Sequence, residues 1–318
     1  MLWYEILLLI LGILLGITAL VLLIAFGCFL KVFYSPKRKQ LGEDEYEFPP
    51  GEIYIPYYDQ MRAWMKDLRT RPQEAVSVTS FDGLTLRGTY YEYSPDAPVE
   101  LLFHGYRGCA ERDLAGGVER CFALGRSVIL IDQRASGKSD GRIISFGINE
   151  RIDCLTWIRF AQEKFGPNKK LIIGGISMGA ATVLLAAGEK LPKNVVCVMA
   201  DCGYSSAKEI IKKVVREMHL PADMVYPFIK LGAKLFGNFN LEESTPLEAA
   251  ARSQTPIVFL HGDTDDFVPY QMSVDVYNVC PAKKMLVKIE GAGHGLAFPK
   301  NQEVYINALR DFQTECGF

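Results

Sequence analysis

The chain has 318 residues, of which 49% are hydrophobic and 23% are charged, so it can bury one sizeable core and is not a disordered protein. Its formal net charge of −2, with no long basic run interleaved with aromatic residues, argues against a nucleic-acid partner. Its eight cysteines include no Cys-x-x-Cys pair, so they predict small buried side chains in a reducing compartment rather than a zinc site, although disulfides stay open.

The first thirty residues are strongly apolar, and residues 6–30 carry no charge. A helix over that stretch measures roughly 37 Å, enough to cross a hydrocarbon core of about 30 Å. The alternative, a cleaved signal peptide, favours a basic start, a shorter apolar stretch and a small-x-small cleavage site. Here the start carries Glu5, and Ala25–Phe29 is a poor cleavage site. We therefore predict an N-terminal transmembrane anchor over residues 1–34.

The charges around this anchor predict its orientation. The residues that follow the uncharged stretch 6–30 include four bases: Lys31, Lys37, Arg38 and Lys39. Only Glu5 and the terminal amine precede it, so the positive-inside rule places the remainder of the chain on the cytoplasmic side. Gly12-x-x-x-Gly16 could let two such helices approach closely, but glycine is common in membrane helices and the oligomeric state stays open.

Residues 35–74, rich in charge, tyrosine and proline, predict a linker with a short helix around Tyr58–Leu68. From residue 75 to 318, short apolar runs alternate with helical segments. The predicted strands are Ala75–Thr79, Leu84–Tyr93, Val99–Phe103, Ser127–Ile131, Leu171–Ile173, Val195–Ala200, Pro256–Leu260 and Met285–Ile289. The predicted helices between them include Glu111–Leu124, Asn149–Phe165 and Ala180–Glu189. The first two strands form a hairpin, and the other buried strands, mostly separated by helices, indicate an α/β fold with a mostly parallel eight-stranded sheet.

One segment, about residues 203–250, breaks this alternation with two amphipathic helices. The first has one apolar face, made of Ile210, Ile211, Val214, Val215 and Met218. The second covers about Ala222–Phe236. We expect the pair to form a small helical cap over an active site. A basic amphipathic cap beside a membrane anchor favours lipid-like acyl substrates; alternatively, its apolar face packs on the main domain and its lysines face water.

A nucleophile is predicted where Leu171–Ile173 leads into Gly175-Ile176-Ser177-Met178-Gly179 and then a helix. A serine on a tight strand-to-helix turn needs small neighbours, and the helix N-terminus offers N–H groups to developing negative charge. The same pattern also occurs by chance, so a glycine-rich turn with a bystander serine is the alternative.

A serine hydroxyl needs a base, and the chain has four histidines. His294 lies in a glycine-rich loop after the last predicted strand, where an imidazole can reach a serine at the edge of the sheet. His104 and His261 each precede a glycine after a strand and are expected to shape those turns, whereas His219 is expected at the cap surface. A structural role for His294 stays open.

The carboxylate that orients this base is expected in the loop of residues 261–269, which follows the penultimate strand. That loop offers Asp263, Asp265 and Asp266, and composition alone does not choose among them. The chain order of serine, then aspartate, then histidine is the order found in α/β-hydrolases.

These motifs make residues 75 to the end resemble the α/β-hydrolase superfamily, in particular its single-domain, membrane-anchored esterase and serine-aminopeptidase-like branch. The resemblance places the acid at Asp265, the fifth position of the loop His-Gly-x-x-Asp-x-x-Val-Pro. A second family loop, His-Gly-x-x-Gly, matches residues 104–108 and implies oxyanion-hole amides at Tyr106 and Met178. The family stretch Asp-x-Arg-Gly-x-Gly-x-Ser matches residues 132–139, but with Ala135 in place of the first glycine.

The sequence therefore predicts a serine hydrolase that cleaves carboxylic esters with a triad of Ser177, Asp265 and His294 and needs no metal or organic cofactor. A thioesterase, a lipase or a peptidase would use the same chemistry, although there is no room for the propeller of prolyl-oligopeptidase-like peptidases. A non-catalytic, membrane-anchored binding protein on a retired hydrolase fold is the alternative of another class.

Overall fold

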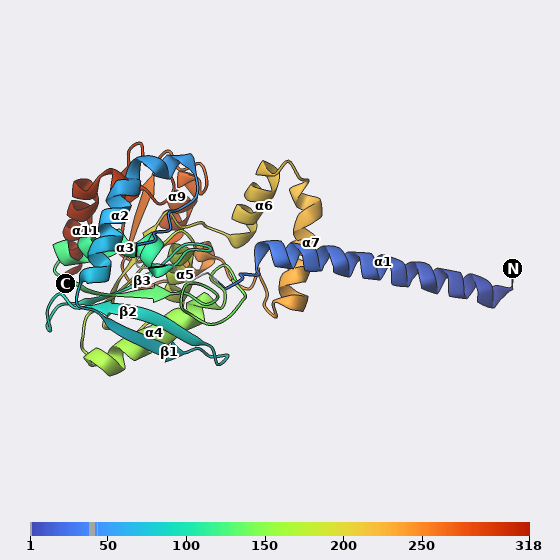
Figure 1. Ribbon diagram of the computed structural model, residues 1–318, viewed down its shortest axis with the longest axis horizontal. Coiled ribbons are helices and arrows are strands. Elements are labelled where there is room, and N and C mark those ends of the chain that lie inside the picture. The colour runs from blue at the N-terminus through green and yellow to red at the C-terminus, as the bar shows by residue number, and fades with distance from the viewer. Residues whose placement is uncertain (1, 38–41, 43) are drawn as a thin grey trace.

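The computed structural model describes residues 2–37, 42 and 44–318, so the predicted flanking bases Arg38 and Lys39 lie outside it. Its centre is one eight-stranded sheet (Figure 1). The strands are β1 (Glu74–Thr79), β2 (Thr85–Tyr91), β3 (Val99–Phe103), β4 (Ser127–Asp132), β5 (Leu171–Ile176), β6 (Val195–Asp201), β7 (Ile257–Gly262) and β8 (Lys284–Ile289). Their order is β1-β2-β4-β3-β5-β6-β7-β8, and only β2 runs antiparallel to its neighbours. The predicted α/β fold and mostly parallel sheet are therefore confirmed.

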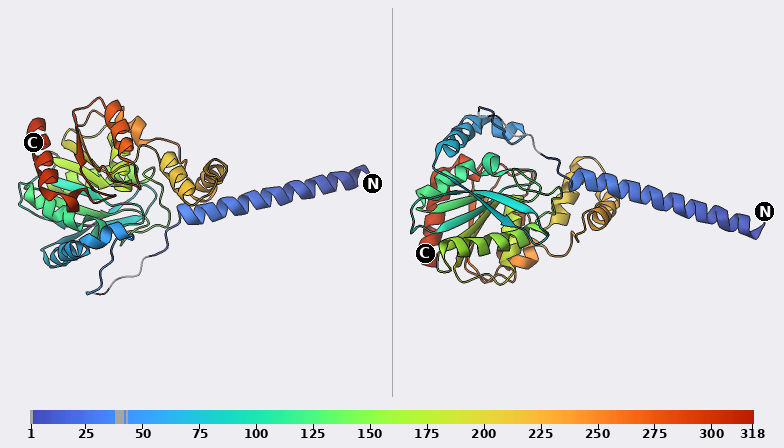
Figure 2. Two further views of the ribbon diagram at one scale, coloured as in Figure 1. Left: turned by 90° about the horizontal axis from the view of Figure 1, so that it is seen from above. Right: turned by 60° about the horizontal axis from the view of Figure 1, so that its bottom comes forward.

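Helices cover both faces of this sheet (Figure 2). One face packs against α4 (Glu150–Phe165), α5 (Met178–Ala187), α8 (Pro246–Ala250) and α9 (Tyr270–Val279). The other packs against α2 (Tyr58–Thr70), α3 (Ala110–Ala123), α10 (Ala297–Lys300) and α11 (Gln302–Cys316). Alternate residues of a strand point to opposite faces, so Leu101 and Phe103 of β3 join the first cluster and Leu102 joins the second.

The segment expected to be a linker packs on the second face of the sheet. It contains a short 3₁₀ helix, η1 (Glu52–Tyr57), followed by α2. Met61, Met65 and Leu68 of α2 are buried in the same cluster as α3 and α11. From η1 onward, this part of the chain therefore belongs to the folded body.

The apolar N-terminal helix α1 (Trp3–Val32) projects away from the body (Figure 1). It is long and apolar enough to cross a membrane, and the most apolar part of it is not buried by the protein. Its end is different, because Phe29 in the last turn and Phe33, directly after the helix, are buried in a third hydrophobic cluster. A β-bridge between Tyr34 and Ile143 then ties the chain to the main domain.

Helices α6 (Ala207–Glu217) and α7 (Ala222–Phe236), together called the cap, supply much of that third cluster. Ile210, Ile211 and Val215 of α6 face inward as predicted, but Met218 is 50% exposed because it lies just beyond the last turn of α6. The cap therefore packs on the end of α1 as well as on the main domain.

Candidate active site

Ser177 occupies a sharp turn between β5 and α5. Its φ of +55° and ψ of −116° are rarely adopted by a residue with a side chain, and such strain persists only where the surroundings enforce it. The flanking glycines are required by space: a Cβ on Gly175 would lie 2.2 Å from the carbonyl carbon of Gly179, and one on Gly179 would lie 2.0 Å from the carbonyl oxygen of Phe103. The Gly-x-Ser-x-Gly pattern is therefore the composition that this turn demands. Helix α5 consequently begins at Met178, two residues earlier than predicted.

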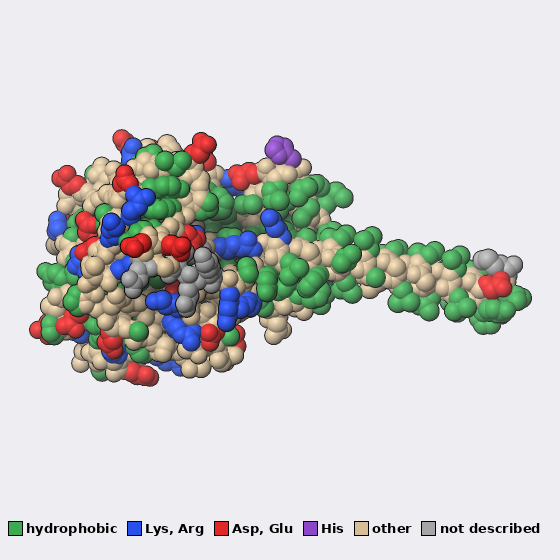
Figure 3. Space-filling view, in the orientation of Figure 1, with side chains coloured by type: hydrophobic (Ala, Val, Ile, Leu, Met, Phe, Trp, Pro, Cys, Tyr) green, Lys and Arg blue, Asp and Glu red, His purple; other side chains and the backbone are tan. Residues whose placement is uncertain are grey.

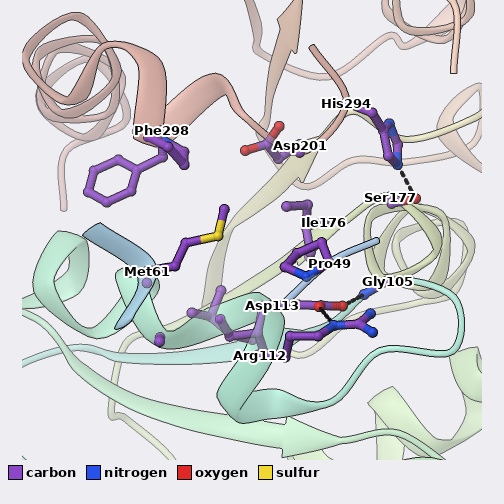
Figure 4. A pocket seen from close by; sticks show the side chains of 18 of the residues that line it. Pro49, Met61, Gly105, Arg112, Asp113, Ile176, Ser177, Asp201, His294 and Phe298 are labelled. Carbon is purple, nitrogen blue, oxygen red and sulfur yellow. Dashed lines mark hydrogen bonds and ion pairs between the residues drawn. The ribbon is translucent and has the colours of Figure 1, made fainter. Parts of the chain in front are cut away.

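The turn points the Ser177 hydroxyl at His294 (Figure 4). The distance from Nε2 of His294 to Oγ of Ser177 is 2.9 Å, and Nδ1 lies 2.7 Å from Oδ2 of Asp265. A neutral imidazole that donates its Nδ1 proton to Asp265 presents Nε2 as an acceptor for the hydroxyl. The structure thus brings together the three side chains that the sequence singled out, across 117 residues between Ser177 and His294.

Both carboxylate oxygens of Asp265 have polar partners. Oδ1 accepts hydrogen bonds from the amides of Phe267 (2.9 Å) and Val268 (2.8 Å), whereas Oδ2 faces His294 and lies 3.2 Å from Nε2 of His261. Burial alone would raise the pKa of Asp265, but hydrogen bonds with His261 and His294 and the charge of His294 lower it to about 2. His261 thus does more than shape its turn, because it contacts the carboxylate directly. Asp263 and Asp266 make no such contact with His294 within the described residues.

The loop of residues 104–108 lies next to Ser177, as expected for an oxyanion loop. The Gly105 amide donates to Oδ2 of Asp113 at 3.2 Å, and the Gly108 amide donates to the Gly105 carbonyl at 3.1 Å. Among the residues that the structure describes, no acceptor is found for the Tyr106 amide. The Met178 amide lies in the first turn of α5, where no intrahelical acceptor exists. Neither amide therefore has a hydrogen-bond acceptor within the described residues.

The side chains of this loop reach the end of α1. The Tyr106 hydroxyl donates to the Val32 carbonyl at 2.7 Å, and Nη2 of Arg107 donates to the carbonyls of Lys31 (2.8 Å) and Tyr34 (3.0 Å). These acceptors include terminal carbonyls of α1, which have no partner within the helix. The end of α1 and the loop of residues 104–108 are thus directly bonded to each other.

His104 and Asp132 form hydrogen bonds with backbone amides near the loop of residues 104–108. His104 is fully buried, its Nε2 accepts a hydrogen bond from the Gln133 amide at 3.0 Å, and burial lowers the pKa of its imidazole. Asp132 accepts from the amides of Ala110 (2.8 Å) and Lys138 (2.9 Å). Ala135, where the family pattern has glycine, adopts a φ of +59°, so this position keeps the glycine-like backbone without the glycine.

A cavity of about 320 Å³ opens beside Ser177 and His294. Its lining is mostly apolar and comes from the η1–α2 segment, α3, and the residues around α10 and α11. It includes Trp64 and, as Figure 4 shows, Met61 and Phe298. None of the residues that line it belongs to α6 or α7. The expected cap over the active site is thus only partly found: Lys213 of α6 bonds the Asp266 carbonyl, but the η1–α2 segment lines the cavity.

Asp201, at the carboxyl end of β6, is a cavity residue that we did not predict. It is 5% exposed, and its Oδ2 accepts a hydrogen bond from the Tyr305 hydroxyl at 2.7 Å. Its Oδ1 has no hydrogen-bond partner within the described part of the chain, and burial raises the pKa of the carboxyl. The signal was present in the sequence, since Asp201 directly follows a predicted strand that neighbours the nucleophile strand.

One group of side chains has the composition of a metal site among the described residues: Cys202, Asp265 and His294 lie within 4.8 Å of one another. Burial raises the pKa of the Cys202 thiol well above its ordinary value, which disfavours the thiolate that binds metals. Both nitrogens of His294 are already hydrogen-bonded. This donor set is better suited to moving a proton than to holding an ion.

Residues 101–229 match the family described as alpha/beta hydrolase fold. YqkD of Bacillus subtilis is 28% identical over 190 residues, and the match covers 59% of this chain and 62% of YqkD. The membrane protein YNL320W of Saccharomyces cerevisiae is 26% identical over 196 residues, covering 61% of this chain and 63% of that protein. The chain thus spans under two thirds of the length of either relative.

Among solved structures, the Pyrococcus furiosus esterase Pf2001 superposes with a TM-score of 0.65 at 20% identity. The superposition covers 89% of this chain and 98% of the esterase. At this identity the likeness establishes the fold, which is the fold that the strand order already indicated.

Proposed function

Because the chain belongs to the α/β-hydrolase superfamily, we propose that it is a serine hydrolase that cleaves carboxylic esters through an acyl-enzyme on Ser177. The observation that carries this proposal is the unbroken chain of hydrogen bonds from Ser177 through His294 to Asp265, at 2.9 and 2.7 Å. Such a chain has a specific chemical use, because an alcohol becomes a nucleophile only when an oriented base takes its proton.

In the first half-reaction, Oγ of Ser177 attacks the ester carbonyl carbon while Nε2 of His294 takes the hydroxyl proton. The carbonyl oxygen becomes an oxyanion, which the amides of Tyr106 and Met178 stabilise. Asp265, ionised because its pKa is about 2, stabilises the imidazolium. The C–O bond to the alcohol then breaks, and His294 returns the proton to the departing alkoxide.

In the second half-reaction, water takes the place of the alcohol. Nε2 of His294 removes a proton from the water, whose oxygen attacks the acyl carbon. The resulting oxyanion uses the same two amides, and the proton on His294 passes to Oγ of Ser177 as the carboxylic acid leaves. Each half-reaction returns the imidazole to its neutral state, so no cofactor is required.

The acyl part of the substrate is expected in the cavity of about 320 Å³, whose mostly apolar lining fits an apolar acyl group. The N-terminal apolar helix and the membrane relative support a membrane location. We propose that the catalytic part lies on the cytoplasmic side, which Lys31 and Lys37 favour within the described residues. Digestion of this part by an external protease in intact cells would refute that orientation.

Thioester, lipid-ester and peptide substrates use the same machinery and form the alternatives within this class. A panel of acyl chain lengths and of oxygen, sulfur and nitrogen leaving groups would rank them. If only short soluble esters were cleaved, a lipid-like substrate would be excluded. A non-catalytic binding protein is the alternative of another class.

The test is labelling with a fluorophosphonate probe, together with ester turnover by the purified full-length protein. Ser177→Ala is expected to abolish labelling and to lower kcat by on the order of 10⁵-fold or more. Ser205→Ala is the matched control, because Ser205 is 9% exposed and Ser177 is 8% exposed, but no hydrogen bond joins Ser205 to His294 within the described residues. Full turnover by Ser177→Ala would refute the proposal.

A further inference from the structure

Helix α7 has apolar side chains on two opposite faces. Tyr226, Ile229 and Ala233 form the face that is buried in the third hydrophobic cluster. On the other side, Met224, Phe228, Leu231 and Leu235 recur every three or four residues and form a second apolar stripe. Met224 is 71% exposed and Leu235 is 50% exposed. A surface helix of a soluble protein normally presents polar residues there, so the second stripe needs an apolar environment.

The position of α7 is fixed by close contact with the membrane helix (Figure 1). A Cβ on Gly232 of α7 would lie 2.5 Å from the carbonyl oxygen of Ala25, so only glycine permits this approach of the two backbones. The ring of Phe236 lies 5.0 Å from that of Phe26 and 5.8 Å from that of Phe29. Helix α7 therefore crosses α1 near Ala25–Phe29, in close contact with it.

That crossing point coincides with the expected membrane boundary. Twenty-two residues separate Trp3 from Ala25, which is about 33 Å of helix, and a hydrocarbon core is about 30 Å thick. Trp3 and Tyr4 are residue types that favour a membrane interface. With those two rings at one interface, Ala25 and the crossing α7 reach the opposite one.

The exposed stripe also faces the side on which the membrane is expected, which is the side from which α1 projects. Figure 3 shows hydrophobic side chains gathered on the side of the cap from which α1 projects, whereas charged side chains are spread over the main domain. The turn between α6 and α7 extends this area, since Met218 is 50% exposed and Leu220 is 44% exposed. Stripe and turn together form one surface that adjoins the membrane helix: Met218, Leu220, Met224, Phe228, Leu231 and Leu235.

We propose that this surface, hereafter the interfacial surface, lies in the headgroup–acyl boundary of the bilayer that α1 crosses. Helix α7 would then lie in the membrane plane, as amphipathic interfacial helices do, with its apolar stripe among the acyl chains. Lys230, which forms an ion pair with Glu242, and Lys234 lie beside the stripe, and the long side chain of Lys234 can keep its charge at the headgroup level. Since the end of α1 is bonded to Tyr106 and Arg107, this contact holds the candidate active site at a fixed height above the membrane.

The test uses the full-length chain in lipid nanodiscs and places a tryptophan on the interfacial surface. In a Trp3→Phe background, which removes the tryptophan of the anchor, Met224→Trp is compared with Val304→Trp on α11. Val304 is the matched control, because it is 44% exposed on a helix of the main domain. Fluorescence is measured with lipids brominated on the acyl chain near the headgroup. Leu235→Trp serves as a second reporter if Met224→Trp does not fold.

The proposal predicts that brominated lipid lowers the added emission of Met224→Trp by about twofold or more and leaves that of Val304→Trp unchanged, because bromine quenches only at contact depth. Equal emission from Met224→Trp in brominated and ordinary lipid would overturn it. A blue-shifted but unquenched emission would overturn it too, because it would assign the surface to a second copy or another protein. The readout does not depend on hydrolysis, so either failure leaves the proposed function untouched.

Discussion

Tyr106→Phe separates two ways in which Tyr106 could stabilise an oxyanion, through its amide or through its phenol. The hydroxyl donates to the Val32 carbonyl at 2.7 Å and is therefore already in use, whereas the amide has no acceptor within the described residues. The substitution keeps the amide and also the ring, whose centroid lies 5.1 Å from that of Phe146. What is lost is one hydrogen bond between the oxyanion loop and the end of α1, worth about 1–2 kcal/mol once the unpaired carbonyl is included.

If all of that energy served to position the loop, kcat would fall by roughly thirtyfold at most, because about 1.4 kcal/mol corresponds to a factor of ten. Loss of an oxyanion donor costs more, about 10²–10³-fold in kcat. Steady-state hydrolysis of a soluble ester by the full-length protein in detergent distinguishes the two. Tyr204→Phe is the control, since its hydroxyl likewise donates to a backbone carbonyl, that of Phe146 at 3.0 Å. A drop of more than 100-fold specific to Tyr106→Phe would refute the assignment to the amide.

Four further substitutions probe the site and the fold. Asp265→Asn removes the acceptor that fixes the His294 tautomer, so kcat for esters should fall on the order of 10⁴-fold, and a loss under tenfold would contradict this. Glu100 forms ion pairs with Arg120 at 2.6 Å and with Arg126 at 2.9 Å, and Glu100→Ala leaves both arginines buried without a counter-charge. The free energy of unfolding, measured with a denaturant, should therefore fall by about 3–5 kcal/mol. An unchanged midpoint of the denaturant transition would contradict this. In the native protein, burial alone would raise the pKa of Glu100, but the two arginines lower it to about 2. Its stabilising contribution should therefore be complete above its ordinary pKa of 4.5 and be lost as the pH falls toward 2; acid unfolding unaltered by Glu100→Gln would count against this. Gly179→Ala would place a Cβ 2.0 Å from a carbonyl oxygen, so reduced folded yield and activity are expected, and normal turnover would contradict the steric account.

The sequence was most informative where a local conformation demands particular residues. The turn at Ser177 excludes side chains at positions 175 and 179, so its steric requirement is visible as two glycines. Buried strands such as β4 and β6 could be predicted for a similar reason, since burial on both faces leaves a run of apolar residues. Asp265 was different: its loop offered three acids, and only the family resemblance chose the one that the structure places 2.7 Å from His294.

Contacts between distant segments could not be predicted from the sequence in this way. Nothing in the pattern of α7 indicates that Gly232 meets Ala25, because a glycine in a helix has many uses. The lining of the cavity by Met61 and Trp64 was not predicted for the same reason. These residues lie in a stretch that resembles a linker until its contacts with α3 and α11 are known. The proposed domain boundaries at residues 34 and 74 stay predictions.

The transient acyl group on Ser177 is the most direct test of the central proposal. The full-length protein is mixed with an excess of a slowly hydrolysed aryl ester, quenched in acid within the first turnover, and mapped by peptide mass spectrometry. The account predicts the mass of the acyl group on the peptide that contains Ser177, and its absence in both Ser177→Ala and unreacted protein. Turnover with the acyl group on another residue, or sustained hydrolysis by Ser177→Ala, would contradict it.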